Sequence, residues 1–334
     1  MLALTVSPPC TKAGGWAENM PQSVEPGLPH GGGAAEPEAE VRRTVRSHLN
    51  DVFFLDAQRG WAVGGGGLVF STVDGGKSWS RHEIIQQDLF RITFANLQDG
   101  WIVGENGALL RTRDGGLSWV RRSAPAPGGY AAVRFVTPLV GWLVGDWILA
   151  TRDAGRTWQH QGSGVAVIFN DIACASVQTC IVVGDSGTVL TTMDGGKSWK
   201  RQESTIQNEP LDRVLIARDG TSWTIGGDAK NRVLLRSGDL GQTWNIASDS
   251  FPIFPTTAHF WDRSRGVIAG NGIALTGDGG KTWVRVKNTP LIQAIYFLDE
   301  RLGWAVGDLR TILHTRDGGR TWNVQNEERS APRP

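Results

Sequence analysis

One short signature occurs seven times along this chain. It consists of a Ser or Thr, one variable residue, an Asp, two small residues or a close variant, and a Ser/Thr-Trp pair. The copies are STVDGGKSW, RTRDGGLSW, ATRDAGRTW, TTMDGGKSW, RSGDLGQTW, LTGDGGKTW and HTRDGGRTW. Their aspartates are spaced at about 40 residues, a period that, with strand-like content, is typical of a β-propeller or another repeat array. They are Asp74, Asp114, Asp153, Asp194, Asp239, Asp278 and Asp317.

The remainder of each period repeats as well. A segment related to Gly-Trp-Ala-Val-Gly precedes each Asp, and an apolar run precedes that segment. When the seven periods are aligned on the Trp of this segment, each aligned position forms a column of seven residues. The columns nine and seven residues before the Trp are nearly all apolar: Val52, Ile92, Val133, Asp171, Val214, Ala258 and Ile295, then Phe54, Phe94, Phe135, Ala173, Ile216, Phe260 and Phe297. In blade four this alignment places Cys180 in the Trp column. The interleaved columns are mixed: Asp51, Arg91, Ala132, Asn170, Arg213, Thr257 and Ala294, then Phe53, Thr93, Arg134, Ile172, Leu215, His259 and Tyr296.

These patterns predict an all-β protein, a seven-bladed β-propeller of four-stranded antiparallel blades. Alternate residues of a strand point to opposite faces, so the apolar columns should pack between blades. The mixed columns should then face the upper mouth of the central channel. We interpret the seven repeated aspartates as structural residues that accept hydrogen bonds within their own turns, and we expect the Trp of each signature to pack on the next blade.

Composition and charge narrow the functional classes. We predict a disordered or loosely attached N-terminal segment over 1–45, the propeller over 46–327 and a flexible tail over 328–334.

The net charge of +1 is too small for nucleic-acid binding. No apolar run is long enough for an integral membrane segment. The six histidines are scattered, so neither a metal site nor a cofactor is predicted. We expect a monomer.

The repeated signature matches the Asp-box of sialidases, sortilin-type receptors and the photosystem II stability/assembly factor family. Its combination with Gly-Trp-Ala-Val-Gly, as at 303–307 and 315–322, most resembles the assembly-factor family, over residues 50–326. The resemblance implies a scaffold rather than an enzyme, and a protein partner, namely a polypeptide segment of a membrane-complex subunit. It also implies a periplasmic or thylakoid-lumen location. No clear signal peptide is present, since the run from Leu2 to Val6 is short, so a cytoplasmic location stays open.

A glycan-active or glycan-binding Asp-box protein is the alternative. The Phe-Arg-Ile-Thr segment at 90–93 resembles the Phe-Arg-Ile-Pro element of sialidases, in which the Arg binds the substrate carboxylate. A sialidase also needs a Tyr nucleophile with a Glu partner. The chain has only Tyr130 and Tyr296, and no Glu is placed by a motif.

Six arginines are the candidate partner-binding residues. Three of them fall in the mixed columns, and the others begin the connections between blades, which should open on the same face. Arginine is suited to bidentate capture of a carboxylate or a chain terminus. The six are Arg91, Arg134, Arg213, Arg121, Arg122 and Arg201.

Two cysteines flank a tight connection in the fourth period. Cys174 and Cys180 should face each other across a hairpin, where a disulfide can form, as similar hairpins of exported bacterial propellers suggest. A disulfide would imply an oxidising compartment. Two buried thiols are the alternative, because Cys packs well as a small apolar residue.

Overall fold

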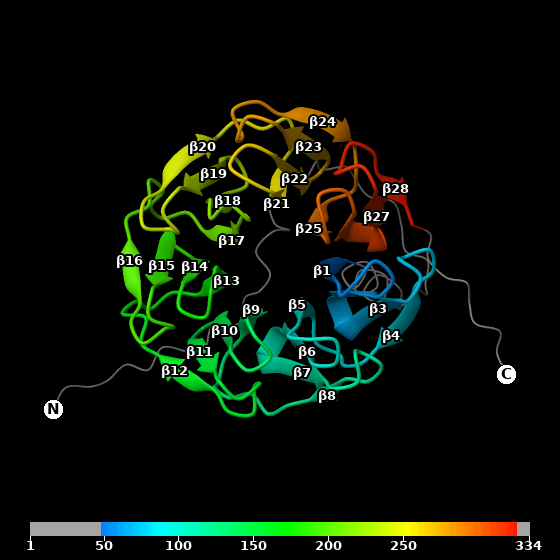
Figure 1. Cartoon of the computed structure of the whole chain (residues 1–334), viewed down its shortest axis with the longest axis vertical. Coiled ribbons are helices and arrows are strands. Elements are labelled where there is room, and N and C mark those ends of the chain that lie inside the picture. The colour runs from blue at the N-terminus through cyan, green and yellow to red at the C-terminus, as the bar shows by residue number, and fades with distance from the viewer. Residues whose placement is uncertain (1–47, 326–334) are drawn as a thin grey trace, which may run out of the picture.

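The structure is a ring of seven four-stranded antiparallel sheets around a central channel (Figure 1). This computed structural model describes residues 48–325. The predicted fold class is therefore confirmed. The predictions for the N-terminal segment over 1–45 and the tail over 328–334 fall outside the described residues and stay predictions, as do the exact domain bounds.

Each blade consists of four consecutive strands, arranged in chain order from the channel to the outer rim. The innermost strands are β1 (Leu49–Phe54), β5 (Leu89–Phe94), β9 (Tyr130–Phe135), β13 (Phe169–Cys174), β17 (Leu211–Ile216), β21 (Pro255–Phe260) and β25 (Ile292–Phe297). The second strands are β2 (Gly60–Gly64), β6 (Gly100–Gly104), β10 (Gly141–Gly145), β14 (Cys180–Gly184), β18 (Ser222–Gly227), β22 (Gly266–Gly270) and β26 (Gly303–Gly307).

The third strands are β3 (Leu68–Thr72), β7 (Ala108–Thr112), β11 (Ile148–Thr151), β15 (Thr188–Thr192), β19 (Arg232–Ser237), β23 (Ile273–Thr276) and β27 (Ile312–Thr315). The outer strands are β4 (Ser80–Glu83), β8 (Val120–Arg121), β12 (Gln159–Gln161), β16 (Lys200–Gln202), β20 (Asn245–Ser248), β24 (Val284–Lys287) and β28 (Asn323–Val324). Short 3₁₀ turns connect the second and third strands in three blades: η1 (Gly65–Gly67), η2 (Glu105–Gly107) and η3 (Asp308–Arg310).

Aromatic side chains fill the seams between blades. At the seam of blades one and two, the ring of Trp61 stacks on Phe94 with centroids 4.4 Å apart. Trp119, the signature Trp of blade two, meets the same Phe94 ring edge-on at 5.8 Å. The signature Trp thus packs toward the preceding blade, and the expectation that it packs on the next blade is wrong. The strand-two Trp faces the following blade instead, so the two tryptophans of one blade serve opposite seams.

The register of blade four differs by one residue from the sequence alignment. Asp171 pairs with Val183, as Asp51 pairs with Val63 in blade one. Cys180 therefore stands at the position of the Gly before the Trp, and its placement in the Trp column is wrong. Because a one-residue shift moves every side chain of a strand to the other face, Asp171 and not Ile172 faces the channel.

Every innermost strand has a bulge near its start, where one residue is left out of the ladder with the second strand. A bulge frees a side chain from the regular alternation and often lies next to a functional site. The bulged residues are Asn50, Phe90, Ala131, Asn170, Asp212, Thr256 and Gln293.

Two of these bulges belong to Asn-Asp pairs that bind the next blade. The Nδ2 group of Asn50 donates to the carbonyl of Leu89 at 2.8 Å, and the amide of Ile92 donates to Asp51 at 2.9 Å. Asn170 and Asp171 make the equivalent bonds to Leu211 and Val214, at 3.1 and 3.0 Å. The paired side chains thereby extend the hydrogen bonding of one inner strand to its neighbour.

The ring closes between blades seven and one without exchange of a strand among the described residues. The rings of Phe54 and Trp304 stack at 3.4 Å between centroids, and the Tyr296 hydroxyl donates to the carbonyl of Phe54 at 2.8 Å. Side-chain contacts therefore join the first and last blades.

Candidate functional site

The strand order gives the propeller two unlike faces. The connections from an outer strand to the next inner strand, together with the turns between second and third strands, lie on one face, which we call the connection face. The seven Asp-boxes and the turns between first and second strands lie on the other, the Asp-box face. Inner strands begin at the connection face, so their bulges surround that end of the channel.

A pocket of about 260 Å³ lies at this end of the channel, and we call it the mouth. Six of its eight lining residues are bulged residues, and the other two are predicted arginines. They are Asn50, Phe90, Arg91, Ala131, Asn170, Asp212, Arg213 and Gln293. The mouth therefore combines two guanidinium groups with three side-chain amides, all held by the first residues of inner strands.

Arg91 lies among carboxylates. Its Nη1 donates to the carbonyl of Phe90 at 2.9 Å, and its Nη2 is buried with no hydrogen-bond partner among the described residues. Burial raises the pKa of Asp51 to about 6, although the charge of Arg91 works in the opposite direction. Burial likewise raises the pKa of Asp171. Arg91 thus lies between the mouth and two carboxylates of the channel, and its Nη2 has no hydrogen-bond partner among the described residues.

Arg213 connects the mouth to the last blade. Its Nη2 donates to the carbonyl of Gln293 at 3.3 Å, and the Gln293 amide donates to Asp308 in η3 at 3.3 Å. Asp212, next to Arg213, forms an ion pair of 2.7 Å with the buried Arg232. Two arginines at the mouth, Arg91 and Arg213, therefore remain free of a direct ion pair with a described carboxylate.

The structure does not bring the six predicted arginines into one pocket. Arg134 lines the channel, near the opposite end of its inner strand, and not the mouth. Arg121, Arg122 and Arg201 are exposed on or just after the outer strands β8 and β16, and none lines the mouth pocket. Whether they contribute to binding stays a prediction.

Both tyrosine hydroxyls are bound to backbone groups. The Tyr130 hydroxyl donates to the carbonyl of Ala126 at 2.8 Å, and that of Tyr296 donates to Phe54. Tyr296 faces the channel, where burial raises its pKa to about 12. His259 also lines the channel, and burial together with Arg218 lowers its pKa to about 4. Neither tyrosine resembles an activated nucleophile.

The Asp-box side chains bind their own turns, as the sequence predicts. In blade two, Asp114 accepts hydrogen bonds from the hydroxyls of Thr112 and Ser118 and from the Ser118 amide, at 2.5–2.9 Å. The amide of Gly116 donates to the Thr112 hydroxyl at 2.8 Å. Hydrogen bonds from Ser118 and Thr112 lower the pKa of Asp114 to about 2. The same bonds recur in all seven boxes.

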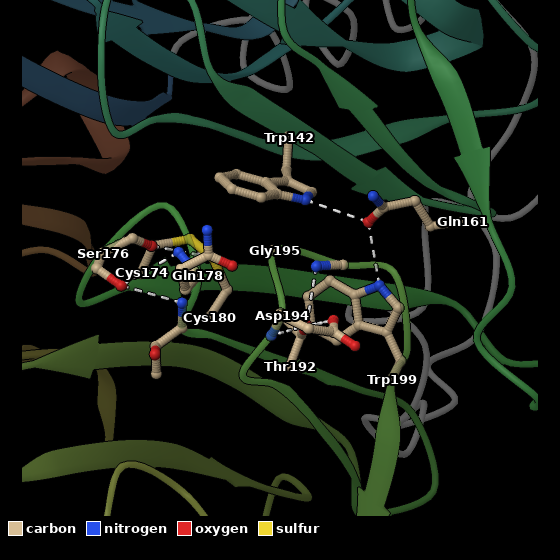
Figure 2. Close-up of a disulfide and its surroundings, with 12 residues drawn as sticks. Trp142, Gln161, Cys174, Ser176, Gln178, Cys180, Thr192, Asp194, Gly195 and Trp199 are labelled. Carbon is tan, nitrogen blue, oxygen red and sulfur yellow. Dashed lines mark hydrogen bonds between the residues drawn. A yellow bond between two sulfur atoms is a disulfide. The ribbon is translucent and has the colours of Figure 1, made fainter.

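Cys174 and Cys180 form a disulfide in the first hairpin of blade four (Figure 2). In five other blades these two positions hold a Phe whose ring covers a Gly, as Phe54 covers Gly60, where an added Cβ would lie 2.5 Å from the ring. Both pairs span the same sequence separation. The disulfide therefore occupies the place of the Phe-Gly contact.

The disulfide lies beside two tryptophans at the seam of blades three and four. Cys180 is fully buried and belongs to one apolar cluster with Trp142 and Trp199. Gln161 accepts hydrogen bonds from both indole N–H groups, at 3.2 and 3.1 Å (Figure 2).

Residues 48–325 hold neither a candidate metal cluster nor a membrane-spanning helix. No cluster of three or more His, Cys, Asp or Glu side chains there could hold a metal ion. No helix in that part of the chain is long and apolar enough to cross a membrane.

The fold and its seven boxes define the class of Asp-box β-propellers. The family model for the photosynthesis system II assembly factor YCF48 matches residues 34–129 and 162–289. The photosystem II assembly lipoprotein Ycf48 of Picosynechococcus sp. strain PCC 7002 is 31% identical over 301 residues, which cover 81% of this chain and 84% of that protein. The chain therefore belongs to the Ycf48 family of photosystem II assembly factors.

Other similarities are more distant. The Ycf48 lipoprotein of Synechococcus sp. strain CC9902 is 25% identical, and the match spans 59% of its length and 69% of this chain. A solved structure of YCF48 bound to a D1 peptide has a TM-score of 0.67 at 22% identity, covering 82% of this chain and 92% of that one. A streptogramin B lyase has a TM-score of 0.68 at 12% identity, covering 84% and 94%. Enzymes thus share this fold.

Proposed function

We propose that this protein is a non-catalytic assembly factor that binds an extended polypeptide segment of a membrane-complex subunit at the mouth of its channel. Membership of the Ycf48 family supports an assembly role. The related YCF48 bound to a D1 peptide supports a polypeptide ligand. The choice of site rests on one observation: Arg91 and Arg213 line the same pocket.

The chemistry of the mouth suits a polypeptide. The two guanidinium groups of Arg91 and Arg213 line the same pocket and can bind a carboxylate. The amides of Asn50, Asn170 and Gln293 lie beside them and can bind main-chain groups. Nearby Asp51 and Asp171 disfavour a highly acidic segment, so we expect a ligand with one carboxylate near polar backbone.

We also place the protein in the periplasm or the thylakoid lumen. The disulfide between Cys174 and Cys180 supports an oxidising compartment, because disulfides persist outside the reducing cytosol. Relatives of this chain are named lipoproteins, which is consistent with that location.

The binding site is tested by fluorescence anisotropy with the D1 peptide, labelled with a fluorophore. The variant Arg91→Gln/Arg213→Gln should bind at least tenfold more weakly, since hydrogen bonds to charged groups contribute about 1.5–3 kcal/mol each. The matched control is Arg113→Gln/Arg156→Gln, which removes two arginines from a pocket on the Asp-box face. Unchanged affinity of the mouth variant, or weakened binding by the control alone, would overturn the assignment of the site.

The absence of catalysis needs a separate measurement. Turnover of a fluorogenic sialoside by the wild-type protein would support the glycan-active alternative and contradict a purely binding role. We expect no turnover, because both tyrosine hydroxyls donate to backbone carbonyls.

A further inference from the structure

The turn η3 of blade seven has an unusual sequence for its backbone conformation. Leu309 and Arg310 both have a φ of 55°, in the left-handed region. Side chains with a Cβ are disfavoured there, at a cost of about 1–2 kcal/mol per residue, and only Gly, Asn and Asp visit it routinely. A non-glycine residue with such a φ that is neither Asn nor Asp therefore needs an explanation.

The equivalent turns of three other blades each contain at least one Gly at these two positions. Blade one has Gly66 and Gly67, blade two has Asn106 and Gly107, and blade four has Ser186 and Gly187, with φ values between 52° and 76°. The pair in blade seven contains neither a glycine nor an Asn. The fold itself therefore does not require Leu309, since the same turn forms elsewhere with less strain.

Leu309 is also exposed. Its side chain keeps 69% of its surface accessible, so it adds little to the core of the described residues. A single exposed Leu is ordinary on a protein surface. Leu240 in the Asp-box of blade five has a similar φ of 59° but is partly buried, whereas Leu309 combines this conformation with exposure. Strained residues are concentrated at binding and switch sites.

Hydrogen bonds connect this turn to the mouth. Asp308, the residue before Leu309, accepts from the side chain of Gln293, and the carbonyl of Gln293 accepts from Arg213. The turn is closed by the amide of Thr311, which donates to the carbonyl of Asp308 at 3.0 Å. Leu309 thus projects from a turn attached to the rim of the pocket that holds Arg91 and Arg213.

We propose that η3 is a second contact element of the polypeptide site, and that Leu309 packs against an apolar side chain of the bound segment. The segment then carries an apolar residue next to the carboxylate that the mouth binds. This inference rests on the proposed function and adds to it the kind of sequence that is recognised.

Two substitutions distinguish the effect of the apolar side chain of Leu309 from the effect of its strained backbone conformation. Leu309→Ala removes the apolar group and keeps a strained residue, whereas Leu309→Asn removes the group and relieves the strain. Both should weaken binding of the labelled D1 peptide by about tenfold, the value of burying a Leu side chain. Only Leu309→Asn should raise the melting temperature of the full chain, by about 1–3 °C.

The control is Leu117→Ala, which removes a Leu that is 88% exposed on the Asp-box face. It should change neither the affinity nor the melting temperature. Wild-type affinity in Leu309→Ala would overturn this inference and leave the proposed function intact. A lower melting temperature in Leu309→Ala would mean that Leu309 packs within its own chain, which also overturns it. Failure of the wild-type protein to bind the peptide would instead overturn the proposed function.

Discussion

The disulfide of blade four can be tested by replacing it with the contact that the other blades use. The variant Cys174→Phe/Cys180→Gly restores the Phe-Gly pair, and Cys174→Ala/Cys180→Ala removes the link and leaves nothing in its place. The two cysteines are separated by six positions. For a loop of this size the chain-entropy relation gives a stabilisation of about 2 kcal/mol.

The two variants should therefore differ in stability. Loss of the disulfide in the Ala variant should lower the melting temperature by about 4–8 °C. In the Phe variant, a ring buried against Trp142 and Trp199 should contribute about 2–3 kcal/mol. That gain offsets the lost cross-link, so the melting temperature should stay within about 3 °C of the oxidised wild-type protein.

Thermal unfolding followed by Trp fluorescence, with and without a phosphine reductant, measures these effects. Reductant should destabilise the wild-type protein and leave both variants unchanged. If the Phe variant is less stable than the Ala variant, the disulfide does not occupy the place of the Phe-Gly contact. If reductant leaves the wild-type melting temperature unchanged while both thiols become alkylatable, the bridge adds no stability.

Three other predictions concern the scaffold. Thr151→Val should lower the free energy of unfolding by about 1–3 kcal/mol in denaturant titrations, because the buried amide of Gly155 loses its acceptor; an unchanged midpoint would contradict this. Asp51 has a folded-state pKa of about 6 against 3.8 in the unfolded chain, so its contribution to stability is present below pH 3.8 and lost as pH rises to 6. Asp51→Asn should therefore flatten that pH profile and raise stability at pH 7 by up to about 3 kcal/mol, whereas an unchanged profile refutes the raised pKa. Tyr296→Phe should lower the unfolding free energy by about 1 kcal/mol by removing the bond to Phe54, and calorimetry measures it; no loss would mean that the bond is unimportant for closure.

The fold could be predicted from the sequence because the same motifs recur in all seven periods. Seven signatures specify seven turns, and the alternating columns specify which side of each inner strand is buried. The sequence of blade four is misleading, because the spacing aligns Cys180 with the Trp of the other blades whereas Cys180 stands at the position of the preceding Gly. The constant separation between Phe54 and Gly60, or Phe94 and Gly100, could have placed it correctly, since Cys174 and Cys180 share that separation.

The candidate site was only partly predictable. Arg91 and Arg213 do share a pocket, because they occupy the same position of their strands. Arg134 lies two residues further along its strand, which is enough to move it away from the mouth. The bulged residues, among them Asn50 and Gln293, were missed, because a bulge changes pairing without a distinctive residue type.

The closure of the ring has a consequence for how such a protein can change over generations. Every described blade is encoded by one uninterrupted stretch, and no blade combines strands from the two ends of the described region. Duplication or loss of a coding unit of one period would therefore add or remove a whole blade and never half of one. New chain ends could likewise be opened in any connection, such as 122–129, without dividing a sheet. Each blade thus corresponds to one continuous unit of the coding sequence, and the number of blades follows from the number of units that are joined.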